Sequence, residues 1–247
     1  MTNFSADAAP PQAADSLVTL LQQLSSESLK QRLAAIDLLL AEGEAGILGL
    51  IDFLRASSIN ASPRERLPDV AAGKAHQALY RSSSPVAQSF VGAELSAGVV
   101  PLVSDINLDY RELMQLLVNQ AYEAADRVTL QKLCELAGPD AVKRKWVYFT
   151  EVDAFPSIDL KTIDTLWRVY SEDRFGFSRQ REIWLGSGRS WERLWDKLKW
   201  KSGNIWTRYP GEFVWDLSAP VGHLPLSNQL RGVRMMESLL CHPVWEA

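Results

Sequence analysis

The sequence has no tryptophan in its first 145 residues, although it contains nine, all between Trp146 and Trp245. It also has no apolar run close to the ~20 residues that a membrane-spanning helix needs. Only two cysteines occur, Cys134 and Cys241, far apart and without metal-type spacing, so we expect a reducing cytosolic compartment. The first sixteen residues hold neither a basic residue nor an apolar stretch, which predicts a short disordered tail rather than a secretory signal or transit peptide.

Side chains for catalysis and for metal binding are equally sparse. The three histidines, His76, His223 and His242, stand alone, without a second ligand at metal spacing. No nucleophile can be paired with a base, and the glycine-containing run at 186–189 lacks the preceding strand of a phosphate-binding loop. The residues alone therefore indicate neither a catalytic constellation nor a dedicated metal site. For His223 an axial contact to a metal carried by a ligand stays open.

What the sequence does contain is a concentration of aromatic and basic residues. Six tryptophans fall within 32 residues, from Trp184 to Trp215. Residues 174–208 hold nine Lys/Arg against three Asp/Glu, a net charge of +6, whereas residues 1–140 carry a net charge of −7. Interleaved aromatic and basic residues suit a ligand that is flat, apolar and anionic at its edge. A single-stranded nucleic acid and a carboxylated porphyrin both fit this description.

The spacing of apolar residues predicts an all-α chain in two parts. Short amphipathic helices cover about the first 80 residues, and Gly43 ends one of them. Helices this short, joined by few residues, pack antiparallel, as in a HEAT-like or armadillo-like bundle. We predict a disordered tail over residues 1–15, this bundle over 16–82, a linker over 83–98 and a core domain over 99–247.

The core domain is also predicted to be helical. A helical pattern runs from Asp109, an expected N-cap, to Leu133 and stops at Gly138 and Pro139. Further helices are predicted over residues 159–170, 178–185, 191–198 and 226–240. The stretch 203–225 has no regular periodicity, and a long irregular loop inside a compact domain is usually functional.

The last predicted helix carries a candidate anion site. At 100° per residue, Arg231, Arg234 and Ser238 lie within about 60° of one another, on a side other than the apolar one. Asn228 lies about 60° beyond them. Two arginines and two neutral hydrogen-bonding side chains on one face form a good carboxylate site. The alternative is an ordinary solvated helix face.

The tryptophans differ in their expected roles. Trp191 and Trp195 belong to a helical i, i+3, i+4, i+7 pattern with Leu194 and Leu198, which favours core packing. Trp206 lies in the irregular loop, where packing is less obligatory, so a binding role stays open for it and for Tyr209 in the same loop.

Several stretches resemble one known family. They are CELAGP at 134–139, WVYFTEV at 146–152, FGFS at 175–178, WKSGNIWTR at 200–208, WDLSAPVGHLPL at 215–226, NQLRGVR at 228–234 and HPVW at 242–245. In this order, from about residue 100 to the C-terminus, they are similar to the Genomes-Uncoupled-Four family, the porphyrin-binding activators of magnesium chelatase in oxygenic phototrophs. The N-terminal helices resemble the accessory bundle of cyanobacterial members, through weaker sequence markers.

The resemblance implies a cupped, all-helical core domain that binds protoporphyrin IX and Mg-protoporphyrin IX and is not itself an enzyme. It implies the large porphyrin-binding subunit of magnesium chelatase as partner and stimulation of Mg²⁺ insertion in chlorophyll biosynthesis. We expect a monomeric, cytoplasmic, cyanobacterial protein, with peripheral membrane association left open. By motif, Phe149 and Val152 would belong to the apolar palm that binds the macrocycle. Trp206 and Tyr209 would lie on the loop that closes over it. The polar margin would be formed by Asn228, Arg231, Arg234 and Ser238.

Two interpretations from other classes stay open. A single-stranded nucleic-acid binder would use the Trp/Arg stretch as a stacking platform, and its affinity would fall steeply with salt. A docking scaffold would use the N-terminal helices to hold a protein partner. For the resembling family the sequence does not separate ligand delivery, allosteric stimulation and shielding of the macrocycle from light. One departure from the family pattern is Tyr209, where a tryptophan often follows the Thr-Arg pair.

Overall fold

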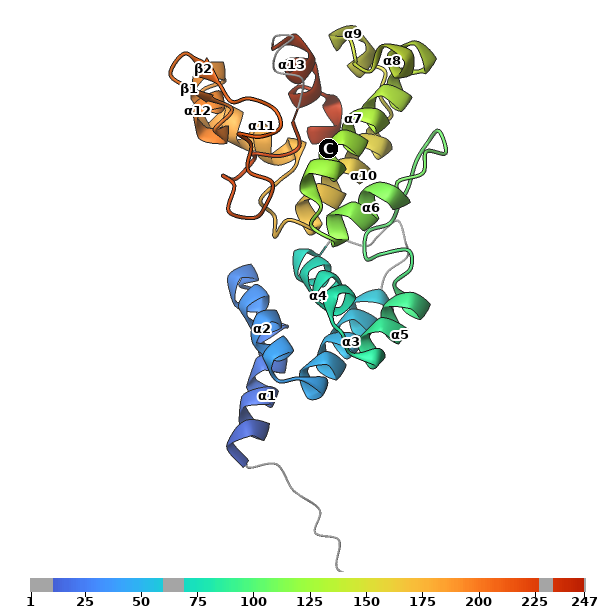
Figure 1. The fold of residues 1–247 in the computed structure, drawn as a ribbon, viewed down its shortest axis with the longest axis vertical. Coiled ribbons are helices and arrows are strands. Elements are labelled where there is room, and N and C mark those ends of the chain that lie inside the picture. The colour runs from blue at the N-terminus through green and yellow to red at the C-terminus, as the bar shows by residue number, and fades with distance from the viewer. Residues whose placement is uncertain (1–10, 60–68, 227–232, 247) are drawn as a thin grey trace, which may run out of the picture.

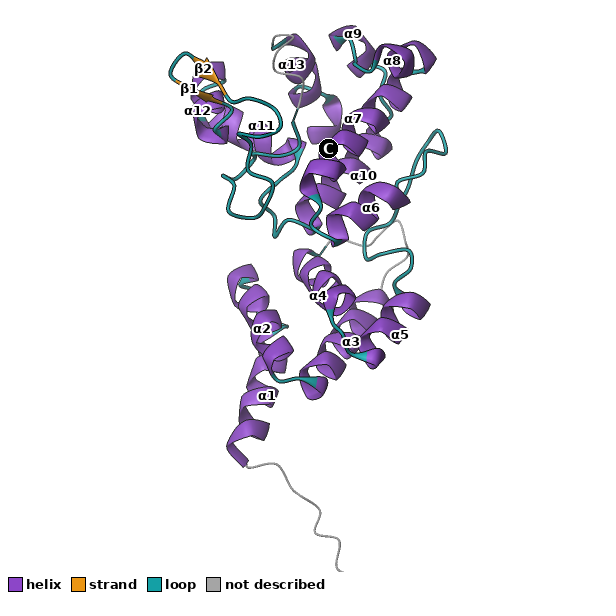
Figure 2. Cartoon of the chain, in the orientation of Figure 1, coloured by secondary structure: helices purple, strands orange, loops and turns teal. Residues whose placement is uncertain are grey.

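A computed structural model describes residues 11–59, 69–226 and 233–246 (Figure 1). Helices and one small hairpin make up the regular structure of these residues, which confirms the all-α prediction (Figure 2). Every helix among them is too short or too polar to span a bilayer. The N-terminal helices are α1 (Pro11–Gln23), α2 (Leu29–Ala41), α3 (Glu44–Ile59), α4 (Val70–Arg81) and α5 (Pro85–Glu94).

The N-terminal helices pack in sequence order around one apolar cluster. Ile36, Leu39, Leu50 and Leu54 are buried at its centre, as helical spacing predicts. Gly43, at φ 66°, lies between α2 and α3 and adopts the left-handed conformation that glycine tolerates best. The antiparallel repeat-like bundle predicted for this part is confirmed.

Two predicted boundaries of this bundle differ from the structure. The segment 83–98, predicted as a linker, contains helix α5, whose Ala87 and Phe90 are buried in the same apolar cluster. Burial of these two side chains therefore extends the bundle beyond the Ser-rich break. At the other end α1 already includes residues 11–15, which we predicted as tail. Residues 1–10 lie outside the described part of the chain.

The second part is built on two long central helices. Its first helices are α6 (Arg111–Val118), α7 (Tyr122–Ala137), α8 (Pro139–Arg144), α9 (Phe149–Val152) and α10 (Ser157–Val169). Tyr122 of α7 and Trp167 of α10 stack at 6.0 Å between ring centroids in the middle of this core. The helical pattern that we predicted as continuous is interrupted at Gln120, whose φ of 56° separates α6 from α7. Asp109 is not the N-cap; it precedes Tyr110, the N-cap of α6, and its carboxylate accepts from the Arg111 amide at 2.9 Å.

A second group of helices extends from the end of α10. It comprises α11 (Phe177–Gly186), α12 (Trp191–Leu198), strands β1 (Lys201–Ser202) and β2 (Ile205–Trp206), then α13 (Arg234–Leu240) and the 3-10 turn η2 (Pro243–Trp245). We call residues 177–206 the aromatic arm. The last helix, predicted from residue 226, is helical from Arg234 in the described structure, and residues 227–232 lie outside it. The stretch 207–226 runs as a long irregular loop (Figure 2).

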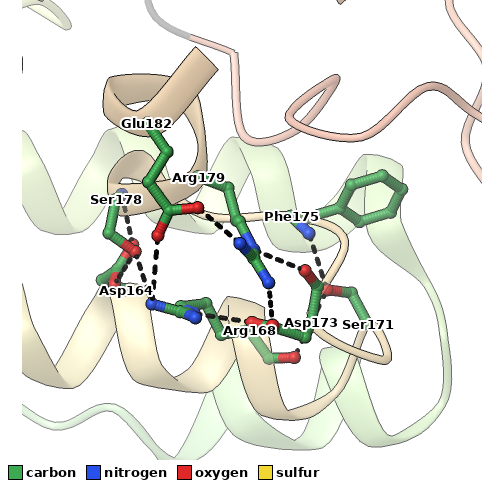
Figure 3. Close-up of polar contacts among 8 residues, drawn as sticks. All are labelled: Asp164, Arg168, Ser171, Asp173, Phe175, Ser178, Arg179 and Glu182. Atoms are coloured by element: carbon green, nitrogen blue, oxygen red, sulfur yellow. Dashed lines mark hydrogen bonds and ion pairs between the residues drawn. The ribbon is translucent and has the colours of Figure 1, made fainter. Parts of the chain in front are cut away.

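A polar network fixes the base of the arm on α10 (Figure 3). Asp173 turns the chain after α10 with φ 63°, and its carboxylate accepts from Arg168 at 2.7 Å and from Arg179. The buried Asp164 carboxylate accepts from the amide and the hydroxyl of Ser178, at 2.8 and 2.7 Å. Because these contacts join α10 to the first turn of α11, the arm has a defined direction relative to the core.

Helix α4 joins the two parts of the molecule. The Gln77 amide nitrogen donates to the carbonyls of Leu117 and Tyr170, each at 2.9 Å, and so satisfies the C-terminal ends of α6 and α10. The Tyr122 hydroxyl donates to the same Tyr170 carbonyl at 2.7 Å. His76 lies 3.0 Å from the Tyr170 hydroxyl, and burial lowers the pKa of this histidine to about 4. The N-terminal part is therefore a packed neighbour of the core rather than a tethered module.

Candidate functional site

A partly open apolar pocket lies between α7 and α8. Helix α8 lies at the end of the molecule away from the N-terminal bundle (Figure 1). The pocket has a volume of about 350 Å³ and is lined by Arg127, Leu130, Gln131, Cys134, Val142 and Lys145. Leu130, Cys134 and Val142 offer apolar contact surface, and Arg127 and Lys145 are cations. Lys145 has no acidic partner among the described residues, whereas Arg127 pairs with Glu123 at 2.7 Å. The lining suits an apolar molecule with anionic substituents.

The irregular loop contacts α7 beside this pocket through Tyr209. Its side chain interacts with Arg127, and burial, together with the Asp126 carboxylate, raises the pKa of its hydroxyl. The Tyr209 ring is 48% exposed and meets Trp215 edge-on, with 5.9 Å between ring centroids. A ring that is half-free and held beside a pocket can close over a flat ligand. The closing role that the family resemblance implies for Tyr209 stays a prediction.

Next to Arg127, a buried carboxylate holds the end of the loop. Asp126 Oδ1 accepts from the Leu226 amide at 2.6 Å, across 100 residues of sequence. Burial raises the pKa of Asp126 to about 7. Sequence analysis missed this residue, although it occurs at helical spacing on the same stripe as Tyr122, Thr129 and Leu133, all of them buried. An acidic residue on an apolar helical stripe was the available signal.

A second exposed apolar group lies where α9 packs against α13. The Phe149 ring is 38% exposed, and the guanidinium carbon of Arg234 lies 5.4 Å from its centroid. Ser238 is half-buried one turn after Arg234, on the same face of α13. Phe149 follows the pocket residue Lys145 by four positions, and α8, α9 and α13 lie at the same end of the molecule (Figure 1).

The remaining predicted site residues are Val152 of the palm, Trp206 of the closing loop, and Asn228 and Arg231 of the polar margin. Val152 is 0% exposed, because the single turn α9 places it in the central apolar core, so it supports the surface that Phe149 forms rather than lining it. Trp206 belongs to the arm: its ring lies 5.8 Å from that of Trp195, and Lys201 lies over it at 5.5 Å. Asn228 and Arg231 lie outside the described residues.

The tryptophans of the arm stack on one another in a column. Centroid separations are 4.9 Å from Trp184 to Trp191, 5.3 Å from Trp191 to Trp195 and 5.4 Å from Trp195 to Trp200, with interplanar angles of 30°, 23° and 13°. This confirms core packing for Trp191 and Trp195. Because Trp191 and Trp195 each stack between two neighbouring indoles, the column offers few free faces on which bases would stack.

The histidines have structural partners. His223 Nδ1 lies 2.6 Å from the Leu198 carbonyl, and its Nε2 accepts from the Val214 amide, so both ring nitrogens are used and neither is left for an axial contact to a metal. His242 Nδ1 accepts from the Val244 amide at 3.2 Å. Within the described ranges no group of three or more His, Cys, Asp or Glu side chains is arranged to hold a metal ion.

Comparison with known proteins gives two family matches that together span most of the chain. A family model described as GUN4-like matches residues 103–243, and one described as an ARM-like repeat domain, GUN4-N terminal, matches residues 10–94. The chain is 48% identical over 231 residues to a Ycf53-like protein of Synechocystis sp., covering 94% of this chain and 97% of that protein. It is 39% identical over 138 residues to the chloroplastic tetrapyrrole-binding protein of Arabidopsis thaliana, covering 52% of each.

Two solved structures resemble the second part of the molecule. The structure of GUN4 from Chlamydomonas reinhardtii aligns with a TM-score of 0.57 and 38% identity, covering 60% of this chain and 95% of that one. The ligand-free structure of Arabidopsis thaliana GUN4 aligns with a TM-score of 0.52 and 38% identity, covering 58% of this chain and 98% of that one. The helical core around α7 and α10 therefore has a known fold.

Proposed function

The chain belongs to the GUN4-like family, and from this premise we propose that it binds a carboxylated tetrapyrrole, protoporphyrin IX or its magnesium derivative. The observation that carries the proposal is the pocket between α7 and α8, which combines apolar contact surface with Arg127 and Lys145 in its lining. The Arabidopsis relative is named as a tetrapyrrole-binding protein, which supports the same ligand class.

The pocket and its surroundings supply what such a ligand needs. Leu130, Cys134 and Val142 offer apolar contact to one edge of the macrocycle, and the exposed Phe149 ring extends that contact. One porphyrin face presents on the order of 250 Å² of apolar surface, worth roughly 6 kcal/mol before the entropic cost of binding is subtracted. A dissociation constant of about 1 μM corresponds to roughly 8 kcal/mol, so one face alone is not enough. With the second face also covered by the loop, we expect a dissociation constant of about 1 μM or somewhat tighter.

Cations orient the ligand more than they strengthen its binding. A propionate can pair with Arg127 or Lys145 at the pocket, and Arg234 offers a planar guanidinium beside Phe149. By resemblance to the family motifs, we also assign Asn228, Arg231 and Ser238 to this polar margin. Tyr209 would close over the exposed face of the macrocycle from its position beside Arg127.

The binding proposal is tested by titration with a soluble dicarboxylic porphyrin, with and without Mg²⁺ in the ring, at two salt concentrations. Quenching of tryptophan fluorescence and the Soret band are both recorded. Saturable quenching with a Soret shift and little salt dependence is the expected result. Absence of both signals would refute tetrapyrrole binding. A steep loss of affinity with salt, together with binding of single-stranded oligonucleotides, would favour the nucleic-acid alternative instead.

We further propose that the bound complex stimulates magnesium chelatase, through its large porphyrin-binding subunit, in the cytoplasm of a cell that makes chlorophyll. The family assignment supports this role. If the protein delivers the ligand, loop variants at Tyr209 lose binding and stimulation together. If it acts allosterically, some variants bind porphyrin normally and fail to stimulate, which a chelatase assay with purified subunits would reveal.

A further inference from the structure

Asp126 is the one acidic side chain on the buried stripe of α7 that begins at Tyr122 and continues through Thr129 to Leu133. Its side chain is 6% exposed, and it immediately precedes Arg127, a residue of the pocket lining. A carboxylate in such a place is costly to keep charged unless a cation or several donors compensate it. The described structure gives it one donor, the Leu226 amide at 2.6 Å, and no ion pair.

Within the described part of the chain, the charged and titratable groups around Asp126 come from two elements. On α7, Arg127 favours the ionised carboxylate and Glu123 opposes it; Arg127 is exposed, Glu123 is half-buried, and the two are paired with each other. From the loop, Tyr209 faces the same region, and its pKa is raised in part by the Asp126 charge. Burial dominates the balance and places the pKa of Asp126 at about 7. The group therefore gains or loses its proton near neutrality.

A ligand carboxylate paired with Arg127 would bring a second negative charge within electrostatic range of this buried carboxyl, which already senses the Arg127 charge. The ligand carboxylate acts on the pKa of Asp126 in two ways, both in the same direction. It repels an ionised Asp126, and it withdraws part of the Arg127 charge that favours ionisation. Both raise the pKa of Asp126 in the complex, so that binding takes up a proton wherever Asp126 is ionised in the free protein.

We propose that Asp126 is a specificity-determining residue of the tetrapyrrole site: protonated, it admits a carboxylate-bearing ligand beside Arg127, and ionised, it repels one. The inference rests on the proposed function, because it concerns the same pocket. Its hydrogen bond to Leu226 keeps the carboxyl in place in either protonation state, since Oδ1 accepts whether or not Oδ2 carries a proton. The affinity for an anionic ligand therefore falls as the pH rises through about 7.

The test compares wild type, Asp126→Asn and Asp140→Asn in titrations with a soluble dicarboxylic porphyrin at several pH values between 6 and 8.5. The amide of Asp126→Asn keeps an acceptor for Leu226 and cannot ionise. Asp140, exposed on the neighbouring α8, is the matched control for removal of one negative charge. Because the ligand's own carboxylates titrate identically in each series, the ratio of dissociation constants isolates the protein group.

For wild type we expect the dissociation constant to rise about tenfold more than for Asp126→Asn over this range, on the order of the repulsion between two unit charges near a protein surface. Asp140→Asn should follow wild type. Equal pH dependence of wild type and Asp126→Asn would overturn the inference. If wild type binds no porphyrin even at pH 6, the proposed function fails, and this inference falls with it.

Calorimetry on wild type alone provides a second measurement, should the variant fold poorly. Binding enthalpies near pH 7, measured in two buffers of different ionisation enthalpy, give the number of protons taken up. Net uptake on binding, largest slightly above pH 7, supports the assignment. Zero uptake at pH 7.5 would contradict it even though the ligand binds.

Discussion

The guanidinium of Arg234 lies over the ring of Phe149, 5.4 Å from its centroid, and thereby joins the single turn α9 to the last α-helix of the chain. The contact leaves a planar cation and a partly free aromatic ring side by side on the surface. Such a pair presents the two features that a propionate-bearing macrocycle would use.

The Arg234 side chain is predicted to contribute to porphyrin binding through both charge and planarity. Arg234→Ala should weaken binding about tenfold, and Arg234→Lys should recover only part of that loss, because an ammonium lacks the flat, two-pronged donor surface. Fluorescence titration measures both effects. Arg189→Ala is the matched control, since Arg189 lies over Trp184 at 5.7 Å in a comparable contact on the arm. Equal losses at the two positions would point to a general charge effect.

Replacement of Tyr209 should change affinity according to ring area. Tyr209→Trp adds stacking surface and is expected to tighten porphyrin binding a few fold, whereas Tyr209→Ala should weaken it about tenfold. Tyr209→Phe separates the ring from the hydroxyl that interacts with Arg127. Stopped-flow measurement of dissociation is the direct assay, because a closing ring affects the off-rate most. Unaltered dissociation in Tyr209→Ala would exclude a closing role.

The junction between the two parts should weaken in acid because of His76. Its folded-state pKa of about 4 lies below the ordinary value of 6.5, so the unfolded state binds more protons between these limits. The contribution of neutral His76 to the free energy of unfolding is fully present above pH 6.5. It is lost as the pH falls toward 4, by about 3 kcal/mol in all. Urea unfolding at several pH values tests this. In His76→Gln, the free energy of unfolding should depend less on pH between 6.5 and 4. The same pH dependence as in wild type would mean that other groups dominate it.

Close approach of backbones at Gly73 makes this position intolerant of a side chain. A Cβ there would lie 2.4 Å from Val169 Cγ1 and 2.5 Å from the Val169 carbonyl oxygen. Gly73→Ala should therefore destabilise the protein by about 1–3 kcal/mol. Gly92→Ala is the control, because a Cβ at this helical glycine meets no atom within 4 Å and should stabilise α5 by up to about 1 kcal/mol. Thermal unfolding of both variants decides the comparison.

Local features of the fold were predictable from sequence, and contacts between distant segments were not. Trp191 and Trp195 revealed their packing through helical spacing, and the helices predicted over residues 159–170 and 191–198 match α10 and α12 to within two residues at each end. Nothing local showed that Gln120 would take φ 56° and divide a continuous apolar pattern into two helices. The burial of Phe90, which makes α5 part of the bundle, depends on residues tens of positions earlier.

The site followed the same rule. Motif resemblance indicated Phe149, Tyr209 and Arg234, and the structure places Arg234 over Phe149 and Tyr209 against Arg127 of the pocket; their part in binding stays a prediction. The pocket itself arises from the packing of α7 on α8, and Asp126 acquires its environment only when Leu226, 100 residues later, lies against it. Periodicity reports which face of a helix is buried, but it does not report which segment covers that face.

The column from Trp184 to Trp200 also gives the arm a spectroscopic signal of its own. Neighbouring indoles at 4.9–5.4 Å, with ring planes inclined by 13–30°, have strongly coupled electronic transitions. Such coupling produces paired positive and negative bands in circular dichroism that depend on the relative orientation of the rings rather than on helix content. The order of the arm can therefore be followed in solution separately from that of the other helices, before and after a ligand is added.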